Sequence, residues 1–231
     1  MEKKLNITAI CGWALPEEWF RKLVAGYFPN ATVRACYPMK PDNDQEATSL
    51  LADDADWLIG YSLGSLWLLH HKNKIKPQTR IALLAPILAF TAEQGAGGKT
   101  PLAKLKYQKK ILLQSNDYAA AMRGFFDISG IRLPENDLKQ PYGREVLIRG
   151  LEFLENFSVP PQTAKDCIAL CGGRDPLLEG LRLKELIPHL NLMNECDHSP
   201  QPLLAHLAQH PEVLHGPGQS VHQPSTPQQA V

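Results

Sequence analysis

The chain has 231 residues, and its 24 Lys and Arg are balanced by 24 Asp and Glu, so the formal net charge is zero. The length is enough for one hydrophobic core with an insertion, and the neutral balance creates no global field that would favour nucleic acid or a membrane surface. The first residues do not follow a signal-peptide pattern, and no apolar run is long enough to span a bilayer. We therefore expect a cytoplasmic protein without nucleic-acid or membrane partners.

Short apolar runs bounded by turn residues predict six strands, at 6–11, 32–37, 57–62, 80–85, 167–171 and 190–194. Most of these runs are apolar almost throughout, as in parallel strands that are covered on both faces. Helical patterns at 16–25, 62–71, 176–186 and 202–209 lie between and after them. The pattern predicts an α/β fold with a doubly wound, mostly parallel six-stranded sheet.

The alternation breaks between the fourth and fifth strands, where 87–162 fits several helices and no strand. The candidate helices are 102–114, 117–126 and 144–157. An all-helical insertion here would lie over the carboxyl edge of the sheet, where open α/β proteins bind ligands. We therefore assign 1–86 and 163–214 to the core and 87–162 to a helical cap. The polar, proline-rich stretch 215–231 is predicted to be a disordered tail.

The segment 60–64, Gly-Tyr-Ser-Leu-Gly, has the pattern of a nucleophile elbow. It follows a predicted strand and opens a predicted helix, which is the context that such an elbow requires. The glycines would relieve crowding around Ser62, and the helix N-terminus favours negative charge. The alternative is a glycine-rich helix start with a capping serine.

A serine nucleophile needs a base, and the base needs a carboxylate, in the chain order Ser, Asp, His for this arrangement. Asp175 follows the fifth predicted strand, and His198 follows the sixth. Asp175 could also cap the helix predicted after it. Asp166 lies at the opposite end of its strand, and Asp197 is adjacent to His198, which disfavours a productive contact.

The same chemistry needs two backbone N–H groups for the oxyanion. Leu63 follows the nucleophile and is one candidate. Trp13 is the other, because it follows the first strand and Gly12 lets the backbone turn beneath the site. The Trp13 side chain could instead form only a wall of the pocket.

Neither a metal nor a cofactor is expected. The five cysteines, an odd number, lie in or beside predicted buried strands and are typical of reduced, small apolar residues: Cys11, Cys36, Cys167, Cys171 and Cys196. No Cys or His pair follows at zinc-ligand spacing. The segment 98–100, Gly-Lys-Thr, ends like a phosphate-binding loop, but Glu93 stands where that motif needs glycine.

The segments 11–14, 60–64, 172–175 and 198–200 together resemble the α/β-hydrolase superfamily. The Gly-Trp pair after the first strand and 147–154, Leu-Ile-Arg-Gly-Leu-Glu-Phe-Leu, are similar to the BioH-type pimeloyl-acyl-carrier-protein methyl ester esterases of biotin synthesis. The resemblance implies a serine carboxylesterase with the triad Ser62, Asp175 and His198. It implies oxyanion donors at Trp13 and Leu63. Two departures are Cys11 in place of a common His and the absence of an antiparallel hairpin before residue 6.

The predicted cap is basic, with ten basic and five acidic residues between Gly95 and Gly150, a net charge of +5. Acyl-carrier proteins are acidic, so the cap could steer one to the pocket. Arg144 and Arg149, on the cap helix that resembles the family, are the candidate contacts. The lysines between Lys99 and Lys110 could equally form a solvated helix face.

Two alternative functions stay open at this stage. One is a generalist short-chain carboxylesterase, for which the basic cap would be incidental. The other is a non-catalytic binding module, against which the complete set of Ser, Asp and His counts.

Overall fold

The computed structural model describes residues 4–115, 117–134 and 142–209. Six strands form one sheet in the order β2-β1-β3-β4-β5-β6, and every neighbouring pair is parallel. They are β1 Leu5–Ile10, β2 Ala31–Cys36, β3 Trp57–Tyr61, β4 Arg80–Leu84, β5 Ile168–Gly172 and β6 Asn191–Met193. All six predicted strands are confirmed, and within the described residues no antiparallel hairpin precedes β1.

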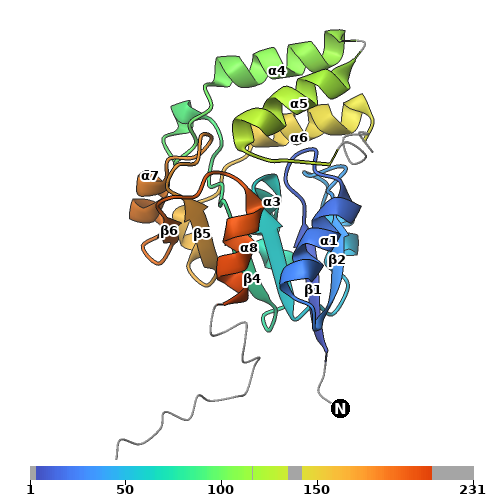
Figure 1. The fold of residues 1–231 in the computed structure, drawn as a ribbon, viewed down its shortest axis with the longest axis vertical. Coiled ribbons are helices and arrows are strands. Elements are labelled where there is room, and N and C mark those ends of the chain that lie inside the picture. Colours follow the sequence, from blue (N-terminus) through green and yellow to red (C-terminus); the bar gives the residue numbers. More distant parts are fainter. Residues whose placement is uncertain (1–3, 116, 135–141, 210–231) are drawn as a thin grey trace, which may run out of the picture.

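The helices cover both faces of the sheet, and three of them lie above the carboxyl ends of its strands (Figure 1). They are α1 Glu17–Tyr27, α2 Asp44–Leu50, α3 Leu63–His70, α4 Leu102–Gln114, α5 Tyr118–Ser129, α6 Arg144–Asn156, α7 Gly180–Leu186 and α8 Pro200–Ala208. Short 3-10 turns lie at η1 Lys72–Lys74, η2 Ala92–Gln94 and η4 Pro161–Ala164. Helices α1 and α8 contact each other on one face, and α3 lies behind the sheet in this view. The doubly wound prediction is confirmed.

Two helices differ most from the prediction, whereas the ends of the others differ by up to three residues. Helix α2 was not predicted at all, because it is short and buries only Ala47, so it has no apolar stripe. Helix α7 was predicted from residue 176 but begins at Gly180. The intervening residues bend and then pair with 97–99 in an isolated antiparallel bridge, in which the Leu177 carbonyl accepts from the N–H of Lys99 at 2.8 Å and the N–H of Glu179 donates to the Gly97 carbonyl at 2.7 Å.

Helix α3 is almost completely buried. Its residues from Leu63 to Leu69 are all buried, which is why its sequence is apolar all round and has no polar face. At its end, the His70 ring meets Phe153 and Phe157 of α6 edge-on, at 5.4 and 4.8 Å between ring centroids. Burial and the neighbouring His71 lower the pKa of His70. Helix α3 therefore joins the sheet to the insertion.

The insertion forms a helical layer above the carboxyl ends of the strands. Helices α4, α5 and α6 all fall within 87–162, the segment assigned to the cap, and lie together above the sheet (Figure 1). Helix α4 packs against both α5 and α6. The predicted disordered tail, 215–231, lies outside the described residues. Among the described helices, none is both long enough and apolar enough to cross a membrane.

Candidate active site

Ser62 occupies a strained turn between β3 and α3. Its φ of 53° and ψ of −115° are rarely adopted by residues other than glycine, and such a conformation costs about 1–3 kcal/mol. The turn is held by its own backbone, because the N–H groups of Ser65 and Leu66 donate to the Ser62 carbonyl at 2.9 and 3.3 Å. The serine side chain is thereby raised above the carboxyl end of the sheet.

The two glycines of the elbow are required by close backbone approach. A Cβ on Gly64 would lie 2.2 Å from the carbonyl oxygen of Ile10, and one on Gly60 would lie 2.7 Å from the carbonyl oxygen of Gly64. Neither distance is possible for a real side chain. The motif therefore lets α3 begin directly against the end of β1.

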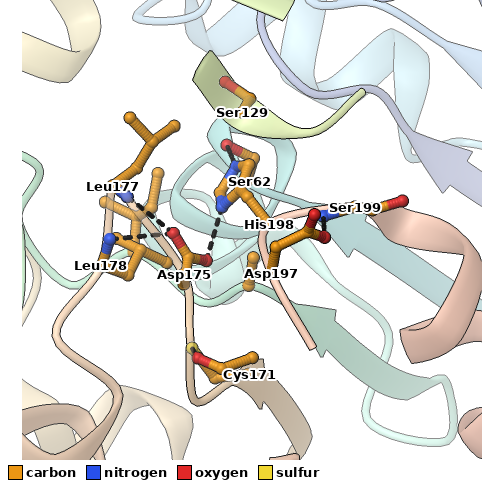
Figure 2. Close-up of polar contacts among 12 residues, drawn as sticks. Ser62, Ser129, Cys171, Asp175, Leu177, Leu178, Asp197, His198 and Ser199 are labelled. Carbon is orange, nitrogen blue, oxygen red and sulfur yellow. Dashed lines mark hydrogen bonds and ion pairs between the residues drawn. The ribbon is translucent and has the colours of Figure 1, made fainter. Parts of the chain in front are cut away.

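Ser62, His198 and Asp175 form one hydrogen-bonded chain (Figure 2). The Nε2 atom of His198 lies 3.0 Å from the Ser62 Oγ, and its Nδ1 atom lies 2.6 Å from the Asp175 Oδ2. A carboxylate only accepts hydrogen bonds, so Nδ1 carries the proton and Nε2 is left to accept from the serine hydroxyl. All three side chains are buried. The arrangement has the order and the tautomer of a Ser-His-Asp triad.

Asp175 is held by the loop that follows β5. Its Oδ1 atom accepts hydrogen bonds from the N–H groups of Leu177 and Leu178 at 2.8 and 3.0 Å, which leaves Oδ2 for His198 (Figure 2). Lys99 adds a bond from its Nζ to the Asp175 carbonyl at 2.7 Å. Since the cap of α7 is Glu179, Asp175 is not the helix cap that the sequence left as an alternative.

The two other carboxylates considered from the sequence lie elsewhere. Asp197 turns back to its own loop, where its Oδ1 accepts from the N–H of Ser199 at 2.8 Å. Asp166 is largely exposed, and its carboxylate lies 3.7 Å from Lys72. Neither carboxylate is bonded to His198.

The loop that carries His198 is anchored by a residue inside the elbow motif. The Tyr61 hydroxyl donates to the His198 carbonyl at 2.7 Å, in a buried contact between residues 137 positions apart. Burial, with smaller effects of Asp175 and Asp197, raises the pKa of Tyr61 well above its ordinary value, so the phenol stays a donor. Sequence reasoning missed this role, because any residue fits the second position of the motif.

The loop after β1 lies beside the elbow. Residues 12–15, here called the oxyanion loop, form a turn in which the N–H of Leu15 donates to the Gly12 carbonyl at 3.2 Å. A Cβ on Gly12 would lie 2.7 Å from the Tyr61 ring, so the loop packs against the residue before the nucleophile. Ala14 has a φ of 66°, which disfavours any residue but glycine. Of the two predicted oxyanion donors, Leu63 thus follows Ser62 directly, and Trp13 lies in the loop that packs against Tyr61.

The Trp13 side chain contacts the cap. Its indole N–H donates to the Leu147 carbonyl on α6 at 2.8 Å, and its ring meets Phe125 of α5 edge-on at 4.8 Å. The side chain therefore packs against the cap helices, and these contacts do not involve the backbone N–H of Trp13.

A mostly apolar cavity of about 270 Å³ lies between the cap helices and the Asp175 loop. It borders the site, because Leu177, whose N–H donates to Asp175, and Phe125, whose ring meets Trp13, are among the residues that line it. The cavity is lined by Phe90, Thr100, Lys104, Leu105, Gln108, Ile111, Gly124, Phe125, Ile128, Leu151, Leu154 and Leu177.

The two arginines expected at the surface of the cap make contacts within it. Arg144 donates to the Ser115 carbonyl, just beyond α4, at 2.7 Å. Arg149 is about two-fifths exposed and lies 3.6 Å from the Glu145 carboxylate on the next turn of α6. Lys104, Lys106 and Lys110 on α4 are exposed.

Comparison with known proteins identifies the fold by structure and not by sequence. No protein-family model matches the chain, and no curated protein matches it by sequence. An esterase from Exiguobacterium antarcticum is similar in structure, with a TM-score of 0.69 and 14% identity over 89% of this chain and 92% of that chain. A bromoperoxidase from Bacillus anthracis has a TM-score of 0.63 and 14% identity, covering 89% of each chain.

A third similar structure is a variant of an N-acyl homoserine lactonase in complex with N-hexanoyl homoserine. Its TM-score is 0.63 and its identity 15%, over 89% of this chain and 88% of that chain. These similarities identify the architecture as the α/β-hydrolase fold. At such identities they show the fold alone, since one fold hosts many functions.

Proposed function

We propose that the protein is a serine hydrolase that cleaves carboxylic esters. The observation that carries this proposal is the buried chain from Ser62 Oγ through His198 to Asp175, with contacts of 3.0 and 2.6 Å. A surface serine that merely caps a helix would need neither the strained φ of 53° nor a histidine oriented by a buried carboxylate.

The mechanism follows from this geometry. The Ser62 hydroxyl attacks the ester carbonyl while His198 Nε2 takes its proton, and Asp175 stabilises the imidazolium that forms. The backbone N–H groups of Leu63 and Trp13 stabilise the oxyanion. The alcohol leaves with the proton from His198. Water then attacks the acyl-enzyme while His198 takes its proton, and the acid is released as the Ser62 oxygen takes this proton back.

The cavity beneath the cap supports an apolar acyl group as the part of the substrate that is bound there. Gly124 lines the cavity, and a Cβ added to it would meet no atom within 4 Å. Gly124 is exposed, so a Gly124→Phe variant would fit without a clash and would add a ring at the wall of the cavity. It is expected to lower kcat/KM for an octanoate ester at least about tenfold and for an acetate ester less than about threefold. Equal effects on both esters would contradict the assignment of the cavity.

As the specific substrate we propose the methyl ester of a pimeloyl group on an acyl-carrier protein. The resemblance of the Gly-Trp pair at 12–13 and of 147–154 to BioH-type esterases, and the net charge of +5 between Gly95 and Gly150, support it. Arg144 and Arg149 stay candidate carrier contacts, but their bonds within the cap make the exposed lysines of α4 better ones. The alternative is a generalist esterase for short acyl esters.

Hydrolysis of p-nitrophenyl butyrate by the wild type and by Ser62→Ala tests the hydrolase proposal. Activity should fall to background in the variant, and activity that persists would refute the mechanism. The carrier is tested by comparing kcat/KM for methyl pimeloyl carrier protein with that for the free dimethyl ester, at low and high salt. Equal values at both salt concentrations would favour the generalist.

A further inference from the structure

We infer that helix α6 of the cap holds the oxyanion loop in its active conformation. The Trp13 side chain is the positioning group that couples the helix to this loop. The inference rests on the proposed function, because it takes the backbone N–H of Trp13 to face the oxyanion. It means that the cap cannot swing away as one rigid lid without disrupting the site beneath it.

The oxyanion loop does not hold its own conformation. Ala14 occupies the left-handed region at a φ of 66°, and an L-residue persists there only where its surroundings impose the conformation. Within the loop, the one backbone bond that closes the turn joins Leu15 N–H to the Gly12 carbonyl at a rather long 3.2 Å. The restraint must come from neighbouring segments.

Two buried hydrogen bonds from the cap supply this restraint. The Trp13 indole donates to the Leu147 carbonyl at 2.8 Å, and the Tyr142 hydroxyl donates to the Leu15 carbonyl at 2.9 Å. Tyr142 lies just before α6, and Leu147 lies in its first half, so both bonds lead to the same helix. Breaking either of them in a buried setting leaves a polar group without a partner.

Packing removes the remaining freedom of the loop. A Cβ on Gly150 would lie 2.7 Å from the Trp13 Cδ1 atom, so the backbone of α6 rests directly on the indole. The Tyr142 ring stacks on Tyr37, which follows β2, with 4.1 Å between ring centroids. Since interiors this close-packed do not deform continuously, a shift of α6 must shift Trp13 with it.

The test compares two buried tryptophans. Trp13→Phe removes the bond to Leu147, whereas Trp67→Phe is a matched control: Trp67 is equally buried, and its indole N–H has no acceptor among the described residues. In Trp13→Phe, kcat for a p-nitrophenyl ester is expected to fall about 10- to 100-fold with KM changed less than about threefold. A boronic acid, whose Ser62 adduct places an oxygen in the oxyanion hole, should bind more weakly by a similar factor.

The control should lower the melting temperature but leave kcat within about threefold, since it changes packing and not the loop. Tyr142→Phe, which removes a single oxygen, is expected to lower kcat about three- to tenfold, and it decides the question if Trp13→Phe does not fold. An unchanged kcat in Tyr142→Phe, or equal kcat values in the two tryptophan variants, would overturn the inference. In that case the proposed function would still stand, provided that Ser62→Ala abolished hydrolysis. A wild type that cleaved no ester would instead contradict the proposed function itself.

Discussion

Asp175→Asn separates the role of the carboxylate from its place in the fold. The Oδ1 atom of Asp175 accepts two backbone hydrogen bonds, from Leu177 and Leu178. The asparagine carbonyl would keep these bonds, which turns the new NH₂ group towards His198. An amide donor facing Nδ1 forces the proton onto Nε2, so the imidazole donates to Ser62 and cannot act as its base.

The expected loss is large because the bond concerned is short and buried. The contact between His198 Nδ1 and Asp175 Oδ2 is 2.6 Å, and both side chains are about 1% exposed. A wrong tautomer in such a triad lowers kcat about 10⁴-fold, which corresponds to about 5.5 kcal/mol of lost transition-state stabilisation. The variant should fold normally, because its backbone bonds are kept.

Steady-state hydrolysis of p-nitrophenyl butyrate measures this loss, with circular dichroism to confirm the fold. Asp197→Asn is the matched control, since Asp197 is adjacent to His198 in the chain but binds the N–H of Ser199. The control should keep kcat within about threefold. The reasoning would be refuted if Asp175→Asn kept more than about a tenth of the wild-type kcat, or if both variants lost the same amount.

Three further predictions concern stability. The free energy of unfolding of Ser62→Gly should be about 1 kcal/mol higher than that of Ser62→Ala, because glycine adopts a φ of 53° without steric cost. Equal melting temperatures of the two variants would argue against strain at the elbow. Gly64→Ala places a Cβ 2.2 Å from the Ile10 carbonyl and should cost at least about 3 kcal/mol in urea titrations. A Cβ on Gly26 of α1 would meet no atom within 4 Å, so Gly26→Ala should instead stabilise the folded protein by up to about 1 kcal/mol. Similar effects of the two substitutions would contradict the crowding argument. Burial raises the pKa of the Cys167 thiol from 9.0 to about 11, so the folded state favours the neutral thiol and the free energy of unfolding should fall as the pH rises through this window. Cys167→Ala should show a shallower fall in denaturation experiments between about pH 8 and about pH 10.5, and an unchanged slope would count against the assignment.

Much of the sheet could be predicted because parallel strands that are covered on both faces need continuous apolar runs. The boundaries of β3 and β4 differ from the prediction only by one residue at their ends. The candidate triad could be predicted for a related reason. Ser62, Asp175 and His198 each follow the carboxyl end of a strand, and in an all-parallel sheet these ends meet at one edge.

Features that depend on tertiary contacts could not be predicted. The bond between Trp13 and Leu147 joins residues 134 positions apart, and neither residue type signals it. Ala14 adopts a positive φ although nothing in its sequence context marks a left-handed position. Helix α2 had one usable signal, since Asn43 caps the N–H of Glu46 at 2.8 Å, but a single buried residue provides no helical periodicity.

The most direct test of the central claim is covalent labelling with a fluorophosphonate, followed by peptide mass spectrometry. The account predicts one label per chain, on Ser62, with loss of esterase activity in proportion to labelling. Ser129, another buried serine, whose hydroxyl donates to the Phe125 carbonyl on α5, should stay unmodified. Labelling of a different serine, or undiminished hydrolysis after Ser62 is fully modified, would contradict the account.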